Sequence, residues 1–164
     1  PWMQESSNKI IQSGEIVSFD TDMVGPYGYC ADISRTYVEG NKFSDKQKKL
    51  YSMAVEQIHH NARLIKPGMS FKEFTEKSWV LPEEYYGNRY SVMVHGIGLC
   101  DEWPAIRYPT DGGERSGTFE TNMTITVESY IGKVGGNEGV KLEQQYLVGK
   151  NNLELMSHHP LEDI

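Results

Sequence analysis

The chain has 164 residues, 38% of them hydrophobic and 24% charged, which is the composition of one ordinary globular domain. Its net charge of -7 argues against a nucleic-acid-binding surface, and no apolar run of about 18 residues predicts a transmembrane helix or a membrane partner. Two cysteines, Cys30 and Cys100, make no disulfide framework, so we expect a cytoplasmic protein in which both are small buried side chains. No signal peptide is recognisable, and because the chain begins with Pro1 rather than Met we expect a trimmed chain or a fragment.

The first predicted elements form a β-hairpin. Residues 15–22 have the β-branched and aromatic character of a strand, "GPYG" has turn chemistry, and residues 27–38 are predicted to be the returning strand. A helix is then predicted from the N-cap Ser44, with Asp45 in its first turn, to the stop at Pro67 and Gly68. The capping box "SFKE" predicts a second helix from Ser70 to about residue 79.

The second half of the chain is predicted to be mostly β. Residues 81–90 and 101–117 are expected to be loops, whereas "SVMVHGIGL", "TFETNMTITVESYIG" and "GVKLEQQYLVG" are predicted strands. The glycine-rich "KVGGNEG" between the last two is interpreted as a turn, because it lacks the Gly-Lys-Ser/Thr ending of a phosphate loop. The tail "LMSHHPLEDI" is expected at the surface. This order predicts an α+β fold, with a curved antiparallel sheet and helices on one face.

Acidic residues recur inside strand-like segments. One such residue alone is most simply a solvated strand face, but several of them together with a histidine fit poorly with independent accidents. Asp20 and Asp22 alternate along one predicted strand, so they should share a face that Asp32 meets across the hairpin. The set is Asp20, Asp22, Asp32, His95, Glu128 and Glu143.

Converging carboxylates need positive charge to offset their repulsion. Arg35 and Lys141 are the nearest bases, and two divalent cations would supply four positive charges against the five carboxylates. Oxygen ligands with one imidazole suit Fe(II), Mn(II), Co(II) or Zn(II). The remaining histidines are expected at the surface: His59, His60, His158 and His159.

The contexts of these residues resemble the pita-bread superfamily of methionine aminopeptidase, prolidase, Xaa-Pro aminopeptidase and creatinase. The motifs "FDTD", "CADISRTY", "VHGIGL", "TITVES" and "GVKLEQQYLV" occur in the family's order and extend from Gly14 to Gly149. The resemblance implies a two-metal centre. It also implies that residues 1–164 are the C-terminal portion of a pita-bread domain whose N-terminal part is absent.

The chain departs from the peptidase pattern in three ways. Two aspartates flank the place where one is usual, no histidine occurs before His59, and "HGIGLCDEWP" has Asp101 where peptidases carry a second histidine. These departures resemble the bacterial dimethylsulfoniopropionate lyases of this fold, which share "PW.QE", "FDTD", "HG.GLCDE" and a tyrosine at the position of Tyr90.

By that resemblance the six residues would bind two metal ions, with iron expected first, and Asp101 would be the general base. A sulfonium carboxylate substrate also favours aromatic faces, which Tyr90 and Trp103 offer first, with Trp2, Tyr85 and Tyr86 as further candidates. The alternatives are a metallo-aminopeptidase or prolidase, and a non-catalytic binding protein on the same scaffold. Relatives imply a homodimer for the full-length protein.

Overall fold

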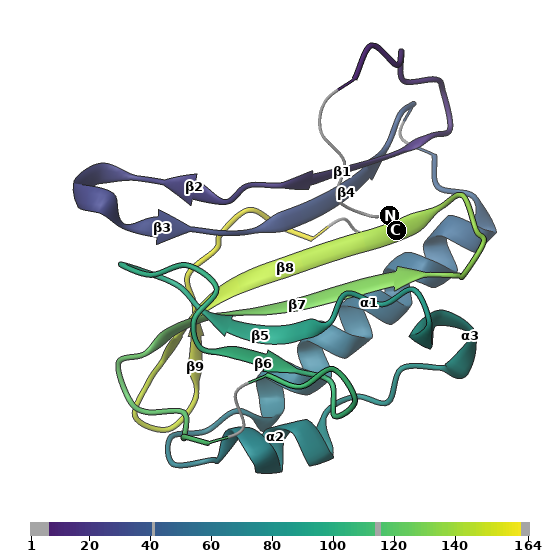
Figure 1. Ribbon diagram of the computed structural model, residues 1–164. Coiled ribbons are helices and arrows are strands. Elements are labelled where there is room, and N and C mark those ends of the chain that lie inside the picture. Colours follow the sequence, from purple (N-terminus) through teal and green to yellow (C-terminus); the bar gives the residue numbers. More distant parts are fainter. Residues whose placement is uncertain (1–6, 41, 114–115, 162–164) are drawn as a thin grey trace.

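The computed structural model describes residues 7–40, 42–113 and 116–161. An antiparallel sheet of five strands in the order β6-β5-β7-β8-β9 forms its centre, and a long hairpin lies along β8 (Figure 1). The sheet strands are β5 (Val92–Gly96), β6 (Ala105–Arg107), β7 (Thr124–Gly132), β8 (Gly139–Val148) and β9 (Leu153–Leu155). The hairpin contains β1 (Ile16–Asp20), β2 (Met23–Val24), the 3-10 turn η1 (Pro26–Gly28), β3 (Cys30–Ala31) and β4 (Ser34–Val38).

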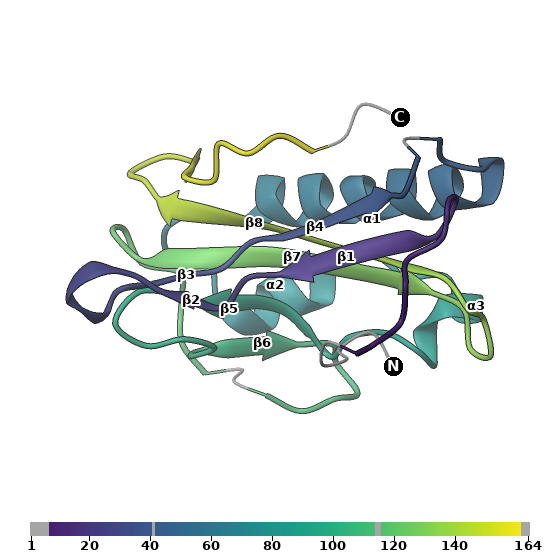
Figure 2. The same ribbon diagram turned by 90° about the horizontal axis from the view of Figure 1, so that it is seen from above.

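Helix α1 (Asp45–Leu64) crosses behind β7 and β8 on the face of the sheet away from the hairpin (Figures 1 and 2). It begins where predicted, because the Ser44 side chain accepts a hydrogen bond from the Gln47 backbone while the Gln47 side chain bonds back to Ser44. The apolar side of α1 is buried against the two longest strands and forms one core with them. This core includes Leu50, Tyr51, Ala54, Ile58, Val127, Ile131, Val140 and Leu142.

The predicted fold class is confirmed: the structure is α+β, with an antiparallel sheet and helices on one face. The boundaries needed correction. Helix α2 (Phe71–Lys77) ends earlier than predicted, and its capping box is only half made, since Glu73 pairs with Lys77 instead of bonding back to Ser70. The loop expected over residues 81–90 contains the short helix α3 (Glu83–Tyr86), and the loop expected over residues 101–117 contains strand β6. Both elements are too short to give a recognisable sequence pattern. Strand β9 ends at Leu155, the first residue of the expected tail.

The tail lies at the surface over residues 156–161, as expected, and the buried side chain of Arg35 anchors it there. Arg35 donates from Nε to the carbonyl of Pro160 over 3.0 Å and from Nη1 to the carbonyl of Glu143 over 2.5 Å. Trp2 and the rest of "PW.QE" lie outside the described residues. Within the described ranges, no helix combines the length and apolar character needed to cross a membrane.

Candidate metal centre

Three strands of the sheet and the hairpin bring the predicted acidic residues and His95 to one place. Glu128 on β7 and Glu143 on β8 are direct cross-strand partners, so their side chains stand next to each other on the same face of the sheet. His95 lies on β5 opposite Thr126, two residues from Glu128 and therefore on that face as well. Asp20 ends β1, and Asp32 lies between β3 and β4. The face opposite α1 thus carries a cluster of carboxylate oxygens around one imidazole.

The distances within this cluster are short. His95 Nε2 lies 3.1 Å from Glu143 Oε1, 3.7 Å from Glu128 Oε1 and 3.8 Å from Asp32 Oδ2. Ser34 Oγ joins the hairpin to the sheet, 2.6 Å from Asp20 Oδ1 and 2.9 Å from Glu143 Oε2. Three groups of side chains hold their ligand atoms within 4.8 Å of one another: Asp32, His95 and Asp101; His95, Glu128 and Glu143; and Asp20, Asp32 and Glu143.

Lys141 is the cation that the cluster uses. It is 3% exposed, and its Nζ lies 2.6 Å from Glu128 Oε2, 3.3 Å from Glu143 Oε2 and 3.8 Å from Asp20 Oδ2. Of the two bases considered from the sequence, Lys141 therefore meets the expectation. Arg35 does not, because its guanidinium bonds to backbone carbonyls and the Gln144 side chain.

Burial and crowding shift the pKa values strongly. Desolvation, with the charge of Glu143 adding to it, raises the pKa of Asp32 to about 8. Desolvation also raises the pKa of Glu128 to about 8, with Lys141 opposing the rise. Desolvation opposes the charged form of Glu143 too, but Lys141 and the hydrogen bond from His95 lower its pKa to about 2. For His95, the bond to Glu143 and the charge of Glu128 outweigh desolvation and raise the pKa to about 10.

Two observations fit a bound metal ion. Glu128 Oε1 is fully buried and has no hydrogen-bond partner among the described residues, a costly arrangement that a cation would relieve. His95 Nδ1 lies 3.0 Å from the carbonyl of Gly96, the second contact that commonly fixes a ligating imidazole with Nε2 toward the metal. Carboxylate oxygens with one imidazole are a donor set for Fe, Mn, Co or Zn.

Asp22 is placed differently from the expectation. Strand β1 ends at Asp20, and Asp22 follows with a φ of 35° in the link to β2, so strand alternation does not bring the two side chains to one face. The Asp22 backbone N–H donates to Asp32 Oδ1 over 3.3 Å, which places the residue beside the cluster. Its carboxylate belongs to none of the three close groups, and its role as a ligand stays a prediction.

Asp101 and Tyr90 lie at the rim of the cluster. Asp101 Oδ1 is 3.9 Å from His95 Nδ1, its side chain is 28% exposed, and it accepts a hydrogen bond from the Glu102 backbone over 3.0 Å. The Tyr90 ring lies over Lys141, with 5.3 Å between Nζ and the ring centroid. Trp103 lies in the same loop as Asp101 and is 61% exposed.

The other candidates lie elsewhere. Tyr85 is part of the core behind the sheet, and Tyr86 packs against Arg89 and Tyr108. The expectation of buried cysteines is wrong for Cys100, which is exposed, and Cys30 is half-buried. Ser34 was not among the residues predicted from the sequence, but it is the cross-strand partner of Asp20 in the hairpin and therefore lies beside its carboxylate.

This chain belongs to metallopeptidase family M24, whose model matches residues 1–150. Among curated relatives, the dimethylsulfoniopropionate lyase DddP of Roseovarius nubinhibens is 40% identical over 166 residues, covering 99% of this chain and 37% of that protein. The Xaa-Pro dipeptidase of Pyrococcus horikoshii is 33% identical over 151 residues, covering 89% of this chain and 40% of that protein. The crystal structure of the prolidase from Pyrococcus horikoshii OT3 has a TM-score of 0.79 at 27% identity, covering 97% of this chain and 44% of that one.

The comparisons confirm the resemblance to the pita-bread superfamily and the assignment of this chain to the C-terminal portion of that fold. The chain spans less than half the length of each relative. The family is metal-dependent, in agreement with the cluster of carboxylates around His95.

Proposed function

We propose that this chain is the metal-binding part of a dimethylsulfoniopropionate lyase, within one pita-bread catalytic domain. The observation that carries the proposal is the Asp101 carboxylate 3.9 Å from His95 Nδ1, at the position where the family's peptidases have a histidine. The relative that is 40% identical and named for this activity supports it. The proposed ligands of two divalent ions, iron first and Mn, Co or Zn as alternatives, are Asp20, Asp22, Asp32, His95, Glu128 and Glu143.

Charge balance favours a pair of divalent ions. The five carboxylates carry five negative charges when ionised, and buried Lys141 offsets one of them. Four positive charges are then required for neutrality, which two divalent cations supply. Without them, desolvation, with the repulsion from Glu143 adding to it, raises the pKa values of Asp32 and Glu128.

The proposed chemistry is a β-elimination. When bound, divalent cations supply positive charge beside the substrate carboxylate, which stabilises the negative charge that develops as the α-carbon loses its proton. Asp101 accepts that proton, and its partial exposure leaves room for a substrate to approach it. The electron pair of the broken C–H bond forms the C=C bond, the C–S bond breaks, and dimethyl sulfide and acrylate result.

The sulfonium end is assigned to aromatic faces rather than to a carboxylate. Tyr90 already holds one cation over its ring in this structure, the ammonium of Lys141. Desolvation raises the pKa of the Tyr90 hydroxyl, so the ring stays neutral. Trp103, exposed in the loop that carries Asp101, is proposed as the second aromatic contact.

The relatives named as Xaa-Pro dipeptidases keep peptide hydrolysis as the second candidate. Against it stands Asp101, at the position where the family's peptidases have a histidine. Headspace measurement of dimethyl sulfide, with hydrolysis of an Xaa-Pro dipeptide measured in parallel, separates the two. We expect sulfide release without hydrolysis; hydrolysis alone would select the peptidase, and neither activity in a metal-loaded protein would select the non-catalytic scaffold.

Asp101→Asn tests the base while keeping an oxygen that can accept the Glu102 backbone hydrogen bond. Sulfide release should fall by about 100-fold or more, since general-base catalysis contributes about 10²–10⁴-fold. Metal content should not change. The matched control is Asp45→Asn, an exposed residue in the first turn of α1, which should retain full release. Near-normal release from Asp101→Asn refutes the assignment.

A further inference from the structure

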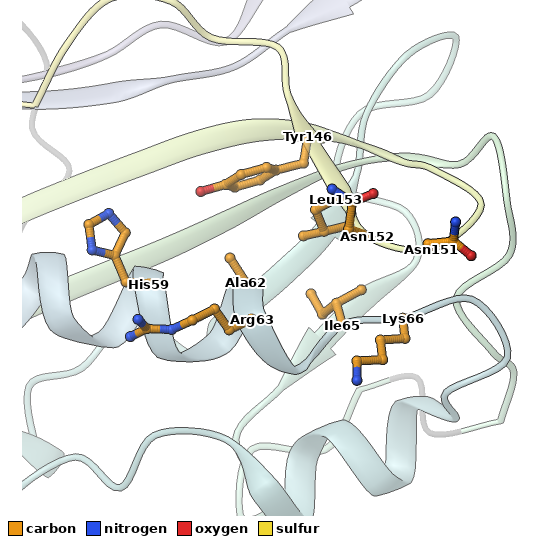
Figure 3. A pocket seen from close by; sticks show the side chains of 9 residues that line it. All are labelled: His59, Ala62, Arg63, Ile65, Lys66, Tyr146, Asn151, Asn152 and Leu153. Atoms are coloured by element: carbon orange, nitrogen blue, oxygen red, sulfur yellow. The ribbon is translucent and has the colours of Figure 1, made fainter.

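A cavity lies on the face of the sheet where α1 packs, opposite the face that carries the metal cluster. It has a volume of about 410 Å³ and lies between the C-terminal half of α1 and the turn from β8 to β9 (Figure 3). Tyr146 lines it and Glu143 belongs to the metal cluster; the two are three residues apart on the regular strand β8 and so point to opposite faces. The cavity is therefore separate from the candidate metal centre.

The cavity is basic in an acidic chain. His59, Arg63 and Lys66 lie one helical turn apart along the same side of α1 and its end, where the helix dipole favours positive charge (Figure 3). Within the part of the chain that the structure describes, no acidic side chain lines this cavity, although the chain carries a net charge of -7. No salt bridge to a described residue neutralises Arg63 or Lys66.

The rest of the lining is neutral and partly apolar. Tyr146 extends over the helix with its hydroxyl toward the side of His59, and Asn151 and Asn152 add amide groups from the turn (Figure 3). Burial raises the pKa of Tyr146 to about 12, so its hydroxyl stays protonated and can donate. Desolvation and the charge of Arg63 lower the pKa of His59, which leaves an uncharged imidazole beside the two cations. Apolar surface comes from Ala62, Ile65 and Leu153.

We propose that this cavity binds a small organic anion, with its carboxylate or phosphate group attracted by the positive charges of Arg63 and Lys66 and its apolar body against Ile65 and Leu153. Two unneutralised cations with neutral donors select an anion and reject a metal ion or a cationic ligand. The volume falls within the range of about 300–1,000 Å³ that is usual for small-molecule sites. The proposal is independent of the reaction at the metal centre, since no residue is shared.

The test is isothermal titration of the metal-loaded protein of natural length with benzoate and, separately, with phenyl phosphate. The variant Arg63→Gln/Lys66→Gln removes both cations at exposed positions. The control Lys48→Gln/Lys49→Gln removes the same charge from exposed positions near the start of α1, roughly 24 Å away at the helical rise of about 1.5 Å per residue. Circular dichroism verifies that both variants remain folded.

We expect saturable binding of at least one probe, about ten-fold or more weaker in the Arg63→Gln/Lys66→Gln variant and unchanged in the control. The probe that binds more tightly distinguishes a carboxylate ligand from a phosphate ligand. Equal losses in both variants would reduce the effect to overall charge and overturn the proposal. If the Arg63→Gln/Lys66→Gln variant binds the probe as tightly as the parent protein, the anion binds elsewhere, for example at the metal centre, and the proposal is wrong. The absence of saturable binding would also overturn the proposal.

Discussion

Within the part of the chain that the structure describes, Lys141 and His95 are the two bases that pair with both Glu128 and Glu143, and replacing Lys141 with methionine removes one of them. The lysine is 3% exposed and lies 2.6 Å and 3.3 Å from the two carboxylates, so the substitution leaves buried negative charge without its nearest partner. Removing one member of a buried ion pair costs about 3–5 kcal/mol. We therefore expect the free energy of unfolding of the metal-free variant at pH 7.5 to fall by about that amount.

The loss should shrink as the pH falls. Desolvation already raises the pKa of Glu128 from 4.5 to about 8, with Lys141 as the main opposing charge, and removing Lys141 raises it further. Above pH 8 Glu128 loses its proton in the folded parent but keeps it in the folded variant up to this higher pKa, so lowering the pH through that window, down to about 8, stabilises the variant relative to the parent.

Urea unfolding in the presence of a chelator, followed by tryptophan fluorescence at pH 9 and pH 7.5, measures both effects, because Glu128 is ionised in the folded parent only at the higher pH. Lys133→Met is the matched control, because Lys133 is 63% exposed and pairs with Glu84 only at the surface. It should change stability by no more than about 1 kcal/mol. A Lys141→Met variant no less stable than this control at pH 7.5 would refute the reasoning.

Three further predictions concern single contacts. Glu128→Gln should weaken metal binding about ten-fold or more, measured by competition with a chromogenic chelator, whereas the exposed control Glu154→Gln should not change it. Equal metal affinities of the two variants would remove Glu128 from the ligand set. Tyr90→Leu should raise KM for the sulfonium substrate about 2- to 30-fold, whereas Tyr90→Phe, which keeps the aromatic ring, should not. Identical KM values in the two variants would show that the ring does not contact the sulfonium group. Ser44→Ala should lower the free energy of unfolding by about 1 kcal/mol in urea titrations, since it removes the hydroxyl that accepts the Gln47 backbone hydrogen bond; an unchanged midpoint would contradict it.

Local signals predicted much of the fold. The N-cap Ser44 and the stop at Pro67 and Gly68 bound α1 because capping and chain-breaking act within a few residues. Strands β7 and β8 were recognisable from their apolar runs, and their pairing places Glu128 opposite Glu143. Boundaries that depend on distant partners were not predictable: β6 exists because β5 offers it an edge, and three residues give too little pattern to show a strand.

Some features of the candidate site could likewise be predicted from the sequence, and others depend on packing between distant segments. Residue type and motif order indicated which acids would meet, but not which base would join them, because Lys141 and Arg35 look alike in sequence and only the packing of β4 along β8 distinguishes them. The strand alternation assumed for Asp22 does not hold because β1 ends two residues earlier. The basic cavity required the C-terminal half of α1 and the β8–β9 turn to come together, a long-range contact that no local pattern encodes.

The central claim is that carboxylates from separate strands and His95 converge in order to hold metal ions. Elemental analysis of the natural-length protein, purified without chelators, tests it most directly, with the double variant Glu128→Gln/Glu143→Gln analysed in parallel. The account predicts two divalent transition-metal ions per chain in the parent protein and a substoichiometric content in the variant. A metal-free parent protein that still releases dimethyl sulfide, or a variant that keeps its full metal content, would contradict it.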